Sequence, residues 1–190
     1  IVSGFNVYPN EVEEVLMANA VHLHLGDTVK TIEGKGTVKK VVTTKGATIE
    51  TDIVILAAGV RPNIQLPKEI GVTIGATGAV AGNSKMQTNI PDVYAVGDVA
   101  ESFSVITGKP IYRPLGSTAN KMGRIAGDVI TGGNLEHRGV LGTSIFRLFN
   151  LHVGQTGLTE KEAKAAGYFV EIIFNIKPDH AEYLGGKELI

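Results

Sequence analysis

The chain has 190 residues and a formal net charge of −1, from 18 Lys and Arg against 19 Asp and Glu, so no basic field is available to hold a nucleic-acid backbone. Hydrophobic residues make up 43% and charged residues 19%, which predicts a packed globular protein. The sequence contains no cysteine, which excludes disulfides, thiolate nucleophiles and cysteine-based zinc sites from this chain. Without a long apolar run or a basic, apolar leader, we expect no membrane segment and a cytoplasmic location.

The first part of the chain predicts one short helix followed by strands. Asn10 is a candidate N-cap for an amphipathic helix of about two turns. Alternating apolar residues and glycine-containing turns then predict a single strand and a β-meander. By residue range, these strands are 20–25, 28–33, 37–43 and 48–50.

Two continuous apolar runs predict strands that are buried in a parallel sheet. The first run is 53–58, and the second is 93–96, which closes on Gly97 and Asp98. A helix is expected over 114–130, because apolar residues recur there at helical spacing before a Thr-Gly-Gly stop.

The last quarter of the chain has the pattern of a separate unit. A helix is expected over 159–166, with Thr159 as its N-cap and Glu162 at the third helical position, the arrangement of a capping box. Period-two segments predict the strands of this unit, which are 142–150, 151–156 and 168–176.

Asp98 is the most informative candidate for binding chemistry. A carboxylate just past the carboxyl end of a buried parallel strand faces the crevice where open α/β sheets bind ligands. The adjacent Gly97 lets a ligand approach the backbone closely. Asp98 would then accept hydrogen bonds from sugar or polyol hydroxyls. The alternative is that Gly97 and Asp98 only end a strand with a turn, and the pair alone does not decide between the two.

Three segments carry a family resemblance. Residues 88–98 contain Thr-x-x-Pro-x-hydrophobic-Tyr-Ala-hydrophobic-Gly-Asp, which resembles the flavin-binding signature of the pyridine nucleotide-disulfide oxidoreductase family. In that family the Asp lies on the ribityl chain of FAD. Residues 52–63 resemble a second family segment, and residues 114–124 are most similar to the branch of coenzyme A-disulfide reductases and NADH oxidases.

The resemblance implies an α/β (α+β overall) fold containing remnants of two Rossmann-like FAD- and NAD(P)-binding domains and an α+β dimerisation domain. By range, the implied parts are 19–57 from the NAD(P)-binding domain, 58–131 from the FAD-binding domain and 132–190 from a truncated dimerisation domain. It also implies a set of FAD-contacting residues and neither catalytic nor metal-ligating ones. The cofactor-binding candidates are Gly59, Gly97, Asp98, Ser117, Thr118 and Ala119.

In an intact relative, a hydride passes from NAD(P)H to FAD and then to a disulfide, a thiol or oxygen. This sequence contains neither a Gly-x-Gly-x-x-Gly turn nor a redox cysteine. We therefore expect weak or absent FAD binding and no turnover by this chain alone. The resemblance further implies a homodimer and a coenzyme A-type small molecule in the intact enzyme. The balanced charge and the lack of a long apolar run predict no nucleic-acid or membrane partner. The alternative function is a non-catalytic dimerisation or interaction module.

Other segments leave open choices. Residues 1–18 resemble a segment of fatty acyl-CoA synthetases, which gives a weaker alternative, an acyl-CoA ligase fragment, although that enzyme's ATP-binding loops are absent.

His22 and His24 alternate on one predicted strand and are interpreted as solvent-facing rather than as metal ligands. Residues 177–183 resemble the branch's Asp-His-Ala-x-Tyr segment, for which surface packing and function both stay open. The same choice stays open for Arg124 on the predicted helix.

Overall fold

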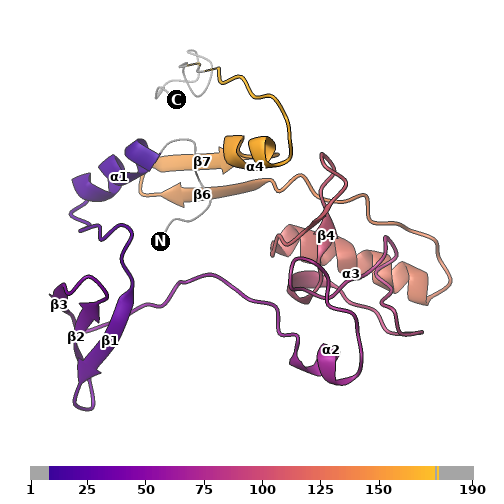
Figure 1. The fold of residues 1–190 in the computed structure, drawn as a ribbon, viewed down its shortest axis with the longest axis horizontal. Helices are drawn as coiled ribbons and strands as arrows, with labels where there is room; N and C mark the ends of the chain where they lie inside the picture. Colours follow the sequence, from indigo (N-terminus) through magenta and orange to yellow (C-terminus); the bar gives the residue numbers. More distant parts are fainter. Residues whose placement is uncertain (1–8, 174, 176–190) are drawn as a thin grey trace.

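A computed structural model of the protein describes residues 9–173 and 175 (Figure 1). In chain order its elements are α1 (Pro9–Ala18), β1 (Val29–Gly34), β2 (Val38–Thr43), β3 (Thr48–Glu50), α2 (Gln65–Glu69), the 3-10 turn η1 (Gly97–Val99), β4 (Ser102–Phe103), β5 (Pro110–Ile111), α3 (Gly116–Ile130), β6 (Ser144–Leu148), β7 (Leu151–Gln155) and α4 (Glu160–Ala165). Helices and strands are mixed along the chain, which agrees with the expected α/β class.

The strands form small antiparallel groups rather than one sheet. Their orders are β1-β2-β3, β4-β5 and β6-β7. The predicted meander is therefore confirmed, and so are the helices α3 and α4 and two of the three strands predicted for the last unit, at 142–150 and 151–156. A long extended stretch leads from β3 to α2 in Figure 1 and separates the meander from the part that contains α3.

The predicted strand at 53–58 is wrong. The backbone there is extended, but it has no ladder partner within residues 9–173 and 175. The side chains of Ile53 and Ile55 are 76% and 85% exposed. A β-branched run favours an extended backbone, but a strand exists only where a neighbouring strand completes its hydrogen bonds.

The strands predicted at 20–25, at 93–96 and over the described part of 168–176 are also wrong, for the same reason. The segment 93–96 is nevertheless packed: Tyr94 forms an isolated antiparallel bridge with Gln87, and Ala95 is buried. It contributes to the core without belonging to a sheet.

Two clusters of buried side chains lie around this segment and α3. The first consists of Val72, Val80, Ala95 and Ala100. The second consists of Met86, Met122, Ile125 and Ala126, with Tyr94 and Val96 packed against it. The helical spacing that predicted α3 therefore marks the face that it buries.

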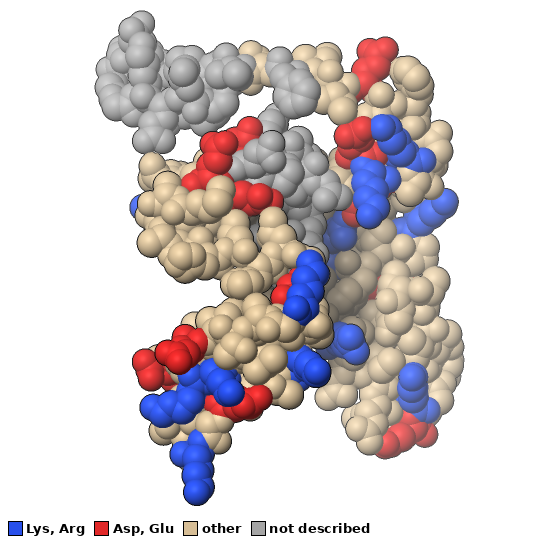
Figure 2. All heavy atoms as spheres, turned by 60° about the vertical axis from the view of Figure 1, so that its left-hand side comes forward, with Lys and Arg blue, Asp and Glu red and all other residues tan. Residues whose placement is uncertain are grey.

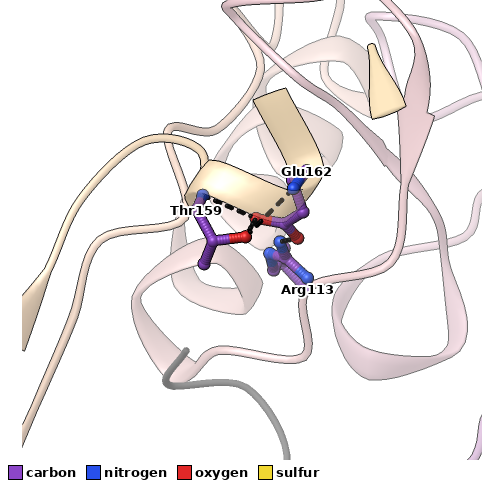
Figure 3. Close-up of polar contacts among 3 residues, drawn as sticks. All are labelled: Arg113, Thr159 and Glu162. Carbon is purple, nitrogen blue, oxygen red and sulfur yellow. Dashed lines mark hydrogen bonds and ion pairs between the residues drawn. The ribbon is translucent and has the colours of Figure 1, made fainter. Parts of the chain in front are cut away.

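The N-terminus of α4 has the predicted capping box (Figure 3). The Thr159 hydroxyl accepts the Glu162 amide at 3.2 Å, and the Glu162 carboxylate accepts the Thr159 amide at 3.0 Å. The same carboxylate forms an ion pair with the guanidinium of Arg113, which precedes α3. One side chain therefore caps α4 and also connects it to the chain segment that enters α3.

Replacing Thr159 by Ala should lower the free energy of unfolding by about 1 kcal/mol, because the buried cap of α4 is lost. Urea unfolding of the variant and of wild type measures the difference. The control is Lys161→Ala on the exposed face of the same helix, which should change stability little. Equal loss in both variants would show that the cap contributes nothing specific.

Candidate functional site

The turn η1 lies directly on α3. Gly97 has a φ of +76°, in the left-handed region that favours glycine. Its amide donates to the Met122 Sδ at 3.3 Å, and a Cβ at this position would lie 3.5 Å from the Cβ of Ala119. Met122 is only 1% exposed. The backbone just before Asp98 is therefore held against a buried core side chain.

Asp98 presents a free carboxylate beside the start of α3. Its side chain is exposed, and within the described residues no donor binds its carboxylate. Its backbone carbonyl accepts a hydrogen bond from the Tyr112 hydroxyl at 2.9 Å. Burial, and then the negative charge of Asp98, raise the pKa of Tyr112 above its ordinary value. The carboxylate is thus close to Tyr112 and open to a ligand.

The first turn of α3 leaves its amides available. Leu115, the N-cap, has no capping side chain, and the Ala119 amide is the first to bond back, to the Leu115 carbonyl at 2.9 Å. The amides of residues 116–118 have no acceptor within the part of the chain that the structure describes. They lie at the positive end of the helix dipole. Ser117 is exposed there and Thr118 is buried.

The structure thus brings Gly97 and Asp98 onto the first turn of α3, which carries Ser117, Thr118 and Ala119. Gly59 does not join them in any contact among the described residues. It has a φ of +89°, ends the exposed 53–58 stretch, and a Cβ there would meet nothing within 4 Å.

Sequence reasoning missed one residue of this site, Tyr112, and a buried carboxylate away from it, Glu101. Tyr112 was not expected to bind near Asp98, because a hydrogen bond between separate elements leaves no periodic pattern. Glu101 is buried, and its carboxylate accepts the Thr77 hydroxyl at 2.9 Å while it occupies the space beside Gly75. A side chain at residue 75 would displace this carboxylate.

The remaining candidates from the sequence are either exposed on the surface or outside the described residues. His22 and His24 are exposed as expected, although they lie outside any strand, and Arg124 is exposed on α3. In residues 9–173 and 175, no group of three or more His, Cys, Asp or Glu residues is arranged to hold a metal ion. The segment 177–183 lies outside the described residues.

The face of the molecule that carries the meander side is mixed in charge. On the face drawn in Figure 2, basic and acidic side chains stand beside one another rather than in one large field of either sign. No helix of the described part is both long enough and apolar enough to cross a membrane.

Replacing Asp98 by Asn should lower the pKa of Tyr112 toward the ordinary value of 10.0, because the phenolate would no longer form beside a negative charge. Titration of tyrosines labelled with carbon-13, followed by NMR, measures this pKa separately from those of the other tyrosines. The control is Asp52→Asn, at an exposed residue directly before the 53–58 stretch, which should leave the pKa of Tyr112 unchanged. If the pKa of Tyr112 is the same in Asp98→Asn and in wild type, the two side chains are not close together in solution.

Comparison with known proteins supports the family resemblance of the sequence. Residues 8–123 match the family model described as pyridine nucleotide-disulphide oxidoreductase. The chain is 48% identical over 181 residues to the NAD(P)H sulfur oxidoreductase (CoA-dependent) of Pyrococcus furiosus, covering 94% of this chain and 40% of that protein. It is 36% identical to the NADH oxidase of Methanocaldococcus jannaschii, covering 94% of this chain and 40% of that protein.

The fold is shared as well. The NAD-dependent persulfide reductase from A. fulgidus superposes with a TM-score of 0.87 at 34% identity, covering 94% of this chain and 33% of that one. The family match begins at residue 8, inside the 1–18 segment. None of the relatives named above is an acyl-CoA synthetase, so the comparisons do not support that resemblance. The chain spans about two fifths of the length of the curated relatives, and it belongs to the pyridine nucleotide-disulphide oxidoreductase family.

Proposed function

We propose that this chain provides the ribityl- and ring-edge-binding part of an FAD site in an NAD(P)H-dependent oxidoreductase. The observation that carries the proposal is the free Asp98 carboxylate, held by η1 beside the available amides of α3. Carboxylate oxygens accept hydrogen bonds from polyol hydroxyls, and helix N-terminal amides donate to an electron-rich carbonyl. Both chemistries fit a flavin nucleotide.

The residues have separate roles in this site. Asp98 binds and orients the ribityl chain, and Gly97 leaves room for it because it has no side chain. The amides around Ser117 and Thr118, joined by Ala119 in the same turn, donate to the pyrimidine edge of the ring. Gly59, which contacts none of these residues, stays a cofactor-binding candidate from the sequence alone. Bound FAD supplies the electron transfer between NAD(P)H and the final acceptor.

The names of the relatives suggest the acceptor. One Pyrococcus horikoshii relative is named NAD(P)H coenzyme A polysulfide/persulfide reductase, at 44% identity. We infer a sulfur acceptor carried on coenzyme A for the whole enzyme, with oxygen as the alternative that the NADH oxidases suggest. A cytoplasmic location stays a prediction.

The proposed division into 19–57, 58–131 and 132–190 is supported by where the core lies. Both buried clusters fall within 58–131, the β1-β2-β3 meander falls within 19–57, and β6, β7 and α4 fall within 132–190. The first two parts correspond to NAD(P)- and FAD-binding domains, and the third to a dimerisation domain.

The isolated chain should bind FAD only at micromolar concentration or more weakly. The sequence holds no Gly-rich turn for the pyrophosphate, and each charge-assisted hydrogen bond lost there costs roughly 1.5–3 kcal/mol. Asp98→Ala should abolish the residual binding, whereas the control Asp52→Ala should not. Calorimetric titration with FAD measures all three proteins. Nanomolar binding by wild type, or equal binding by wild type and Asp98→Ala, contradicts the proposed site.

The purified chain used for the FAD titration also serves to test enzymatic activity. We expect no NAD(P)H-dependent turnover with added FAD, because neither a redox cysteine nor a Gly-rich cofactor turn is present in the sequence. Turnover that increases in proportion to the amount of purified chain would overturn this expectation.

A homodimer is the proposed assembly, and exposed apolar side chains in the 132–190 part support it. Ile145 on β6 is 75% exposed and Phe169 is 89% exposed, which is unusual for a surface without a partner. If the chain dimerises and stays colourless, it acts as an interaction module rather than as a flavin-binding part.

Light scattering at micromolar concentration should give the mass of a dimer. Ile145→Lys should shift the mass toward the monomer, because a charge would be buried in the contact. The control is Ile55→Lys, which changes an isoleucine that is 85% exposed and lies outside the 132–190 part. A monomeric wild type, or the same shift in both variants, argues against dimerisation through this part.

A further inference from the structure

After α3 the chain runs back along β4 before it reaches β6. We call residues 131–141 the connector. The Val140 amide donates to the Phe103 carbonyl at 2.8 Å, and the Val105 amide donates to the Val140 carbonyl at 3.1 Å. Gly139 has a φ of +89°, and a Cβ there would lie 2.6 Å from the Phe103 carbonyl oxygen. The connector is therefore pressed against the backbone of β4.

His137 fixes the middle of the connector. The side chain is buried at 6% exposure, and its Nε2 lies 2.8 Å from the hydroxyl of Ser102, which is 2% exposed. Its backbone amide donates to the Ser84 carbonyl at 2.7 Å. One residue thus joins the connector to β4 and to the turn at residue 84.

The charged groups around His137 offer no compensation for a positive imidazolium. Lys121 on α3 is a like charge whose repulsion acts on His137. Next to Ser102, the Glu101 carboxylate is committed to the Thr77 hydroxyl and amide. Next to Ser84, the Lys85 ammonium binds the side chain of Asn134.

The remaining charges lie at the C-terminal end of α3 and on either side of His137 in the connector. The Asp128 carboxylate accepts the Leu135 amide at 2.9 Å, and Glu136 and Arg138 are exposed. No carboxylate is hydrogen-bonded to the imidazole among the described residues. Burial, and then the charge of Lys121, lower the pKa of His137 below its ordinary value of 6.5.

We propose that His137 is a pH-sensitive latch: the neutral imidazole holds the connector on β4, and protonation releases the connector and loosens the link between α3 and the β6, β7 and α4 part. The latch does not depend on the proposed FAD site, because none of its contacts involves Gly97, Asp98 or the first turn of α3.

Proton linkage determines the direction in which pH shifts the equilibrium between closed and released connector. The released histidine binds a proton more tightly than the buried one, so the closed connector is favoured at high pH and is lost as the pH falls below 6.5. One pH unit below the pKa of a free histidine, protonation can raise the opening constant by at most about tenfold. The steepest change should therefore lie in the weakly acidic range.

Hydrogen exchange of backbone amides, followed by NMR on the full chain at about pH 7.5 and about pH 5.5, tests the latch. After correction for intrinsic exchange rates, the amides of His137, Val140 and Val105 should lose up to about tenfold of their protection at the lower pH. The amides of Met122 and Ile125 in α3 should keep theirs. Unprotected connector amides at both pH values, or an equal loss in α3, would overturn the proposal, since the second result means global unfolding.

Two variants separate protonation from general weakening. His137→Gln retains a polar side chain that cannot titrate, so connector protection should become independent of pH. His152→Gln, at an exposed histidine on β7, is the matched control and should behave as wild type. If His137→Gln does not fold, direct NMR titration of wild type decides instead: His137 must titrate below the exposed histidines. A His137 that titrates with them, or an unchanged pH response in His137→Gln, contradicts the latch.

Discussion

The contact between Gly97 and Met122 positions everything that the site offers. A thioether is a weak hydrogen-bond acceptor, so the strength of the arrangement comes from packing: Met122 is enclosed by the second core cluster, and the left-handed Gly97 lets the backbone descend onto it. The backbone of Asp98, the next residue, is therefore fixed by packing against the core, while its side chain is exposed to solvent. A rigid support beneath an exposed functional group reduces the ordering cost of binding a ligand.

Two adjacent residues before α3 make contacts in different directions. Tyr112 binds the Asp98 carbonyl, whereas Arg113 pairs with Glu162 and passes over Gly142, where a Cβ would lie 3.3 Å from the arginine Nε. An ion pair as exposed as this one adds little stability by itself. Its importance is geometric, because residues 112 and 113 connect the segment that enters α3 both to the Asp98 turn and to α4.

Local patterns predicted much of the fold, and non-local contacts account for the rest. The α3 helix, the meander and the capping box at Thr159 and Glu162 depend on residues only a few positions apart, so periodicity and spacing reveal them. The runs at 53–58 and 93–96 have strand composition but need a neighbouring strand, which local composition does not report. The Gly97 and Asp98 pair was proposed first from a strand predicted at 93–96, which the structure does not form, and then from a family signature. Tyr112 was missed because its role arises from tertiary packing alone.

Leaving the 53–58 stretch bare affects how this polypeptide behaves during synthesis and storage. Within the described residues, the backbone amides and carbonyls of this stretch beyond Ile53, which bonds to the Thr51 hydroxyl, have no partner. An uncovered apolar segment of this kind is a template onto which another chain can add a strand. Native proteins usually protect such edges with charges or prolines, yet the first charges on either side here are Asp52 and Arg61, outside the apolar run. The solubility of the chain therefore depends on how soon, and by what, this segment is covered as it leaves the ribosome.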